Sequence, residues 1–210
     1  MTLSWRFFLI VLSERFILDG GCDRAMYNEA GAATRSAWQI NPRLAQVKFS
    51  SKHLMFTTIK GYFKGVRGTI ILDEADPVYS SVEVEIDTPN LYSGVQYRDN
   101  YLKSPDFLDV KKYPTITFKS THVELLGSDR ARVVGDLTIR GITHEVALDT
   151  RLTERGKGPG GQEAIEFEAR TSINRKDFGL TWNMALEADG FLVSDTIKIE
   201  IAVEALKQSL

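Results

Sequence analysis

The feature that most constrains the fold is a strict alternation of apolar and polar residues, which recurs in several short segments. In the clearest example, TIKIEIAVEAL, one set of alternate positions holds Ile197, Ile199, Ile201 and Val203 and the other holds Lys198, Glu200, Ala202 and Glu204. A period of two is typical of a β-strand with one buried and one solvated face. Several such antiparallel strands around one apolar interior predict a sandwich or a barrel, and a barrel of about eight strands can enclose a small ligand.

The alternation and the turn signals between segments divide the chain into a series of strands. Short strands are predicted around Trp38 and Val47, followed by strands over 62–72, 81–88, 115–125, 132–140, 144–152, 164–173 and 194–206. Two segments do not alternate: 52–59 is predicted as a short helix across one end of the sheet, and 94–103 as a second helix. Glycines within 62–72 predict bends of the kind that close a barrel. The sequence therefore predicts an all-β fold with a few short helices.

Composition excludes several classes of function. The chain has 210 residues and a net charge of −2, which argues against a nucleic-acid partner. Its one cysteine, Cys22, permits no disulfide within the chain. His53, His122 and His144 lack the spacing of a zinc site, so no metal or other cofactor is predicted. We also find no sequence motif of a catalytic nucleophile and predict that the protein is not an enzyme.

The first part of the chain differs from the rest. Residues 1–36 are predicted to be a poorly ordered extension or a weak targeting segment, and 37–210 a single barrel domain. The apolar run WRFFLIVL is too short to span a bilayer as a helix, and it makes a poor signal peptide. We therefore expect no stable transmembrane insertion. A cytoplasmic location is favoured, with a periplasmic or secreted location as the alternative.

Several longer motifs carry a family resemblance. In chain order they are WQINPRLAQVKFSSKHL, GYFKGVRGTIILDE, YRDNYLKSPDFLDVKKYPTITFKST, GDLTIRGITHEVALD, NRKDFGL and VSDTIKIEIAVEA. Together they resemble the YceI-like polyisoprenoid-binding family over about residues 37–206. The resemblance implies an eight-stranded, lipocalin-like antiparallel barrel with an elongated apolar lumen. It also implies a homodimer and the non-catalytic binding, storage or transport of a long-chain isoprenoid, polyprenyl or quinone-like lipid.

The predicted inward faces and this resemblance together give a candidate lumen. Its lining is predicted to comprise Val47, Phe49, Leu54, Phe63, Ile70, Val84, Phe107, Phe118, Leu137, Ile139, Phe167, Ala169 and Phe178. Polar groups in the two motifs RDNYL and NRKDFG are predicted to tie loops to the barrel end. Contact with a lipid head group is the alternative role of Arg98, Asp99, Asn174 and Arg175.

Two other functions remain open from the sequence. The same cavity would also suit an enzyme that acts on a small apolar substrate. Alternatively, Val, Ile and Phe side chains fill the interior completely and leave no room for a ligand. The protein would then be a stress-related structural dimer with a filled core.

Overall fold

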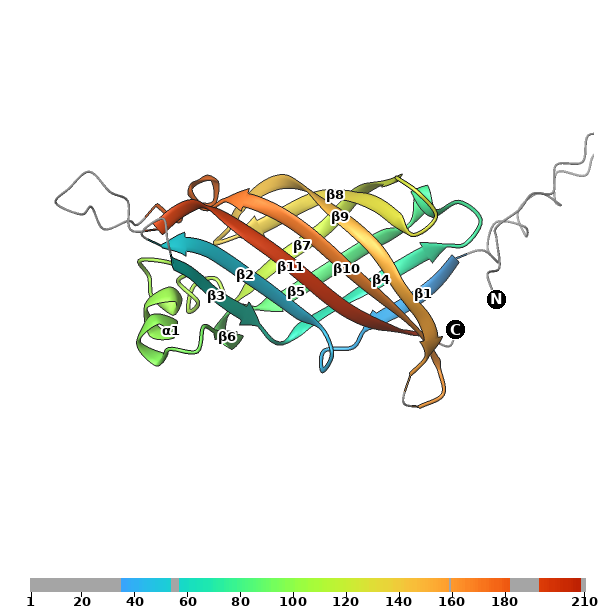
Figure 1. The fold of residues 1–210 in the computed structure, drawn as a ribbon, viewed down its shortest axis with the longest axis horizontal. Coiled ribbons are helices and arrows are strands. Elements are labelled where there is room, and N and C mark those ends of the chain that lie inside the picture. The colour runs from blue at the N-terminus through green and yellow to red at the C-terminus, as the bar shows by residue number, and fades with distance from the viewer. Residues whose placement is uncertain (1–34, 54–56, 159, 182–192, 209–210) are drawn as a thin grey trace, which may run out of the picture. The chain divides into compact units, whose positions relative to one another are not determined.

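The structure, a computed structural model, describes residues 35–53, 57–158, 160–181 and 193–208. The predicted extension falls almost entirely on residues outside this range. The described residues form a closed antiparallel barrel, with one short helix beside one end (Figure 1). Its strands are β1 (Arg35–Ile40), β2 (Gln46–His53), β3 (Thr57–Phe63), β4 (Val66–Asp73), β5 (Ser81–Asp87), β6 (Leu91–Tyr92), β7 (Thr115–Leu125), β8 (Arg130–Ile139), β9 (Ile142–Lys157), β10 (Glu163–Asn174) and β11 (Val193–Lys207). The helices are η1 (Pro77–Tyr79), η2 (Thr88–Asn90), α1 (Gln96–Lys103) and η3 (Arg175–Phe178).

The 11 strands make a ring of eight because three positions in the ring are each occupied by two consecutive strands. β1 and β2 both pair with β11. On their other side, β4 pairs with β1 and β3 pairs with β2. β5 and β6 then pair with β4 and β3. The ring continues through β7, β8, β9 and β10 to β11, and the pairing of β11 with β1 closes it. The predicted eight-stranded antiparallel barrel is thus confirmed.

Each interruption has a local cause. Between β1 and β2 the chain turns at Asn41, whose carbonyl accepts from the Ala45 amide at 2.9 Å. Between β3 and β4 it turns at Gly65, where φ is +74°. That left-handed value favours glycine because it has no Cβ to clash with the backbone. The segment predicted as one strand over 62–72 is therefore two strands that meet at this glycine.

The predicted helix over 52–59 is wrong. β2 extends to His53, β3 starts at Thr57, and the two strands pair as a hairpin in which Ser51 faces Ile59. β11 pairs with the other edge of β2, so the ladder satisfies backbone groups on both sides of that strand. Strand pairing here outweighs the weak local preference for a helix. By contrast, the helix predicted over 94–103 is present as α1.

One end of the barrel carries most of the non-strand structure. α1 follows β6 there, η3 follows β10, and the tight β8–β9 turn lies at the same end, with Arg140 and Gly141 both at positive φ. Arg140 reaches across the turn and donates to the Gly179 and Pro105 carbonyls at 3.2 and 2.9 Å. These bonds join the segments after η3 and α1 to the barrel. The opposite end contains the β9–β10 hairpin tip, as its glycine-rich sequence predicts.

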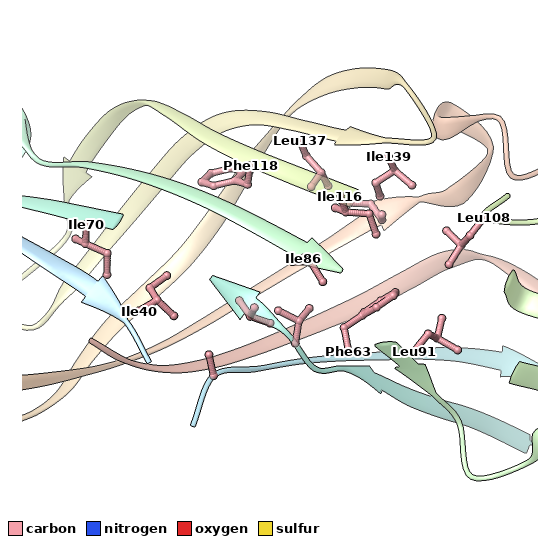
Figure 2. Packing of buried hydrophobic residues seen from close by; sticks show 14 of the residues in the cluster. Ile40, Phe63, Ile70, Ile86, Leu91, Leu108, Ile116, Phe118, Leu137 and Ile139 are labelled. Atoms are coloured by element: carbon pink, nitrogen blue, oxygen red, sulfur yellow. The ribbon is translucent and has the colours of Figure 1, made fainter. Parts of the chain in front are cut away.

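Buried apolar side chains from most strands meet inside the barrel. Figure 2 shows Phe63, Phe118 and Leu137, from β3, β7 and β8, pointing into the same interior. Two inward glycines make room for large rings. A Cβ on Gly61 would lie 2.3 Å from the Phe49 ring, and one on Gly135 would lie 2.7 Å from Phe118 and 2.4 Å from the Lys119 carbonyl oxygen. Part of the interior is therefore packed through aromatic rings that lie directly over strand backbone.

We expect Gly135→Ala to destabilise the barrel by about 1–3 kcal/mol, because the added methyl group meets both a ring and a backbone oxygen. Gly127→Ala is the matched control, since its Cβ would meet no atom within 4 Å. Urea unfolding would measure both, and the control should be unchanged or slightly more stable. Equal stability of the two variants would contradict this account of the packing.

Candidate functional site

The candidate site is the interior wall formed by β9, β10 and β11. The outward residues of these strands, such as Lys198 and Glu200, are exposed, and the residues between them pack against the core. Many of these inward residues are nevertheless only partly buried. They are Val146, Leu148, Leu152, Phe167, Ile197, Ile199, Ile201 and Val203. Apolar side chains that point inward and keep accessible surface indicate that neighbouring side chains do not fill the interior beside this wall.

The opposite part of the ring is different. Most inward side chains from β1, β3, β4, β7 and β8 are buried, including Trp38 at 1% exposure and Phe118 at 7%, whereas Leu72 and Val133 are only partly buried. Phe49 adds to this packing through Phe63, with ring centroids 5.5 Å apart. Partly buried inward residues are therefore most numerous on β9, β10 and β11, although a few, such as Phe49 on β2 and Val84 on β5, lie elsewhere in the ring.

The predicted lumen residues include both buried and partly buried side chains. The buried members are Val47, Phe63, Ile70, Phe118, Leu137, Ile139, Ala169 and Phe178. The partly buried members are Phe49, Val84, Phe107 and Phe167. Leu54 lies outside the described residues. Most of the predicted set thus belongs to one buried cluster, and the partly accessible members are the stronger candidates for contact with a ligand.

Phe178 occupies a position that no strand pattern predicts. It belongs to η3, is 1% exposed, and packs edge-on against His144 with ring centroids 5.2 Å apart. The His144 ring also contacts the Asp177 carbonyl through Nε2 at 2.9 Å. This segment therefore inserts an aromatic ring into the core cluster at the α1 end of the barrel.

Arg98 and Asp99 are occupied by contacts within their own loop. Arg98 donates to the hydroxyl and the carbonyl of Ser93, each at 2.9 Å. The Asp99 carboxylate, 7% exposed, accepts from the Ser93 amide at 2.7 Å and from its hydroxyl at 2.5 Å. These bonds hold the start of α1 against the end of β6.

Arg175 is fully buried at the other loop. Its guanidinium donates to the Leu180 carbonyl, to the Ser194 carbonyl at 3.1 Å and to Asp195 at 2.9 Å. Asn174 caps η3, because its side-chain oxygen accepts from the Lys176 amide at 3.0 Å. The NRKDFG segment is thus bonded to the beginning of β11.

The accessible wall also includes residues that were not among those predicted from the sequence to line the lumen. Ile197, Ile199 and Ile201 on β11 give the clearest alternation in the chain, yet we did not place them in the predicted lumen. Val146 and Leu148 on β9 were missed in the same way. Alternation marks them as inward, but it does not show which inward residues keep accessible surface.

The described part of the chain offers few groups for other chemistry. No cluster of three or more His, Cys, Asp or Glu side chains there is arranged to hold a metal ion. No helix among the described residues is long and apolar enough to cross a membrane. Buried polar and charged residues are Asp73, Thr88, Asp99 and Arg175. None of the four lies on β9, β10 or β11, so no buried charge lies on the accessible wall, which is mainly apolar.

A closed eight-stranded antiparallel barrel with this interior defines a lipocalin-like protein. The model of the YceI-like domain matches residues 38–205, and the chain belongs to that family. A UPF0312 protein of Pseudomonas putida is 37% identical over 181 residues, covering 85% of this chain and 91% of the relative.

Solved structures agree with this assignment. The crystal structure of the Campylobacter jejuni YceI protein has a TM-score of 0.65 at 32% identity, covering 75% of this chain and 90% of that one. A polyisoprenoid binding domain from Saccharophagus degradans has a TM-score of 0.60 and covers 82% of this chain and 99% of that one. At 14% identity, the second likeness supports the fold alone.

Proposed function

We propose that this protein binds an isoprenoid-type lipid inside the barrel and carries or stores it without catalysis. The observation that carries the proposal is the apolar wall of β9, β10 and β11, whose inward side chains keep accessible surface. Membership of the YceI-like family and the fold shared with a polyisoprenoid binding domain support the same class of ligand.

The chemistry of the wall favours a hydrocarbon over a polar ligand. Its polar inward residues include Thr150 and Thr171, and the Thr150 hydroxyl already donates to the Leu148 carbonyl at 3.2 Å. A polar ligand here would lose its hydrogen bonds to water with little replacement. A branched hydrocarbon loses none, and it matches a surface of Val, Ile, Leu and Phe.

The energetics favour a long chain over a small molecule. Burial of hydrocarbon yields about 0.8 kcal/mol per CH₂. A chain with about a dozen buried carbons would therefore gain on the order of 10 kcal/mol before the entropic costs of binding. No contact with a charged group is needed for such affinity, which agrees with the use of Arg98 and Arg175 in contacts within the protein.

Extraction of the purified protein tests this proposal. The full chain, prepared without detergent, would be extracted with chloroform and methanol, and the extract analysed by mass spectrometry. We expect a polyprenyl lipid or prenylquinone at up to one molecule per chain, and native mass spectrometry should show the same mass bound without a covalent bond.

Two results would contradict lipid binding. The first is an empty protein that also fails to take up an added synthetic polyprenol. The second is conversion of the added polyprenol to a product during incubation, which would favour the enzyme alternative.

A further inference from the structure

A second feature of the molecule lies on the outside of the barrel, where β11, β2 and β3 run side by side (Figure 1). Their outward positions over 196–202, 46–52 and 58–62 hold four lysines and a single acidic residue, Glu200. Lys64 after β3 and Lys103 on α1 extend this surface toward the helix. We call it the lysine face. It comprises Lys48, Lys52, Lys60, Lys64, Lys103 and Lys198.

The lysine face is not neutralised by the protein itself. Among the described residues, none of its six lysines lies within ion-pair distance of a carboxylate. Arg130 on β8 and Arg170 on β10 also have no ion-pair partner among the described residues, whereas five other cations on the outside of β4, β7, β8 and β9 form ion pairs. They are Arg67, Lys119, Arg132, Arg151 and Arg155. A chain with a net charge of −2 thus concentrates unpaired positive charge on one side of its barrel.

Aromatic side chains accompany the charge. Tyr62 and Tyr92 stack across β3 and β6 with ring centroids 5.6 Å apart. The ammonium groups of Lys64 and Lys103 each lie 5.5 Å from the Tyr92 ring centroid. Two like charges are thereby held beside one ring that is itself 40% exposed. Beyond Tyr92, Val95 and Tyr97 are 48% and 82% exposed, so apolar surface continues from the lysine face to α1.

We propose that the lysine face docks the protein on a lipid bilayer that contains anionic phospholipid. Unpaired lysines complement a negatively charged headgroup layer, and tyrosine rings are favoured at the boundary between headgroups and hydrocarbon. The lysines attract the headgroup layer electrostatically over several ångströms. Tyr92, Val95 and Tyr97 supply apolar surface at one edge of the lysine face. The docking surface is separate from the barrel interior, so it does not depend on the proposed lipid ligand.

The side chains favour a bilayer over a nucleic acid. All six cations of the lysine face are lysine, whereas arginine gives the bidentate contacts that are typical of phosphate recognition in nucleic acids. The Tyr62 and Tyr92 rings already stack on each other, and the Lys64 ammonium lies 5.8 and 5.5 Å from their centroids, so both rings are engaged in contacts within the protein.

Vesicle sedimentation tests the proposal with the full chain. Wild-type protein should bind vesicles of phosphatidylcholine with 30% phosphatidylglycerol in 50 mM NaCl. It should bind pure phosphatidylcholine vesicles much less, and should be released as salt rises toward 500 mM. The triple variant Lys48→Ser, Lys60→Ser, Lys64→Ser should lower the partition coefficient by about fivefold per lysine, or about a hundredfold in all.

A control triple variant separates the lysine face from net charge. This variant carries Lys119→Ser, Arg132→Ser and Arg151→Ser, so it also loses three positive charges, but from other strands. It should bind the charged vesicles nearly as well as wild type does. The N-terminal extension is the same in all these proteins, so it does not account for a difference between them. Equal losses in the two triple variants would overturn the proposal, as would equal binding to charged and uncharged vesicles.

Two further measurements complete the test. Ala169→Trp, which alters the interior, should bind vesicles as wild type does; loss of binding would show that sedimentation reports lipid uptake, and would overturn surface docking. A double-stranded DNA and a single-stranded RNA would be titrated in the same buffer. Tighter, lysine-dependent binding to either nucleic acid than to the vesicles would also overturn the proposal.

Discussion

Replacement of Arg175 with alanine is expected to lower the free energy of unfolding by about 1–3 kcal/mol for each carbonyl that loses its donor, the largest single effect predicted for this barrel. The arginine side chain is fully buried, and its guanidinium bonds the Leu180 and Ser194 carbonyls and Asp195. Without it, carbonyl groups at the start of β11 and after η3 lose their donors inside the protein. Urea unfolding followed by circular dichroism would measure the change.

Lys176→Ala provides the matched control. Lys176 forms an ion pair with the same carboxylate, Asp195, at 2.8 Å, but its side chain is 42% exposed. Loss of such a solvated pair should cost about 0–1 kcal/mol. Bound lipid should fall in Arg175→Ala only in proportion to unfolding. If the variant is fully stable but selectively loses lipids that carry a polar head group, Arg175 instead contacts the head group of the ligand.

Ala169→Trp is expected to remove most lipid binding while the barrel still folds. Ala169 is on β10, between Thr150 of β9 and Ile201 of β11, and its side chain points inward and is 7% exposed. An indole there would occupy the space that the proposed ligand needs. Overpacking should cost about 1–3 kcal/mol of stability, whereas lipid recovered by extraction should fall at least tenfold if the ligand lies along this wall.

Ala202→Trp on β11 is the control for this variant, because Ala202 is exposed and pairs with Glu168 on the outer face. It introduces the same indole without entering the interior, so it should retain lipid. A folded Ala169→Trp protein with undiminished lipid would place the ligand elsewhere. Severe unfolding, with normal lipid in the folded remainder, would indicate a packed core at this position.

Sequence alone determined the class of fold because alternation is a local property. A strand with one buried face must alternate wherever it lies in the ring, so the segments that became β5, β7, β8, β10 and β11 were predictable. The turn at the glycine-rich segment after β9 and helix α1 were also encoded locally. The helix predicted over 52–59 failed because the ladders of β11 and β3 hold β2 as a strand, and single-segment propensity does not include those partners.

The site depended on tertiary structure to a greater degree. Polar motifs around Arg98 and Arg175 were visible in the sequence, but their partners, Ser93 and Asp195, became clear only with the chain folded. Alternation identified Ile199 and Phe118 equally well as inward residues. The closed ring decides that Phe118 is buried against Gly135 whereas Ile199 keeps accessible surface, because burial depends on what the other side of the barrel places opposite each residue.

The lysine face shows the same division. The sequence determined that Lys48 and Lys198 occupy outward positions, since each alternates with an inward residue, whereas Lys60 lay outside the predicted strands and is outward only because β3 pairs with β2. Read along the chain, these lysines are scattered among acidic residues and resemble an ordinary mixed surface. Only the pairing of β11 with β2 and of β2 with β3 gathers them on one side, because strand register joins residues that are about 150 positions apart.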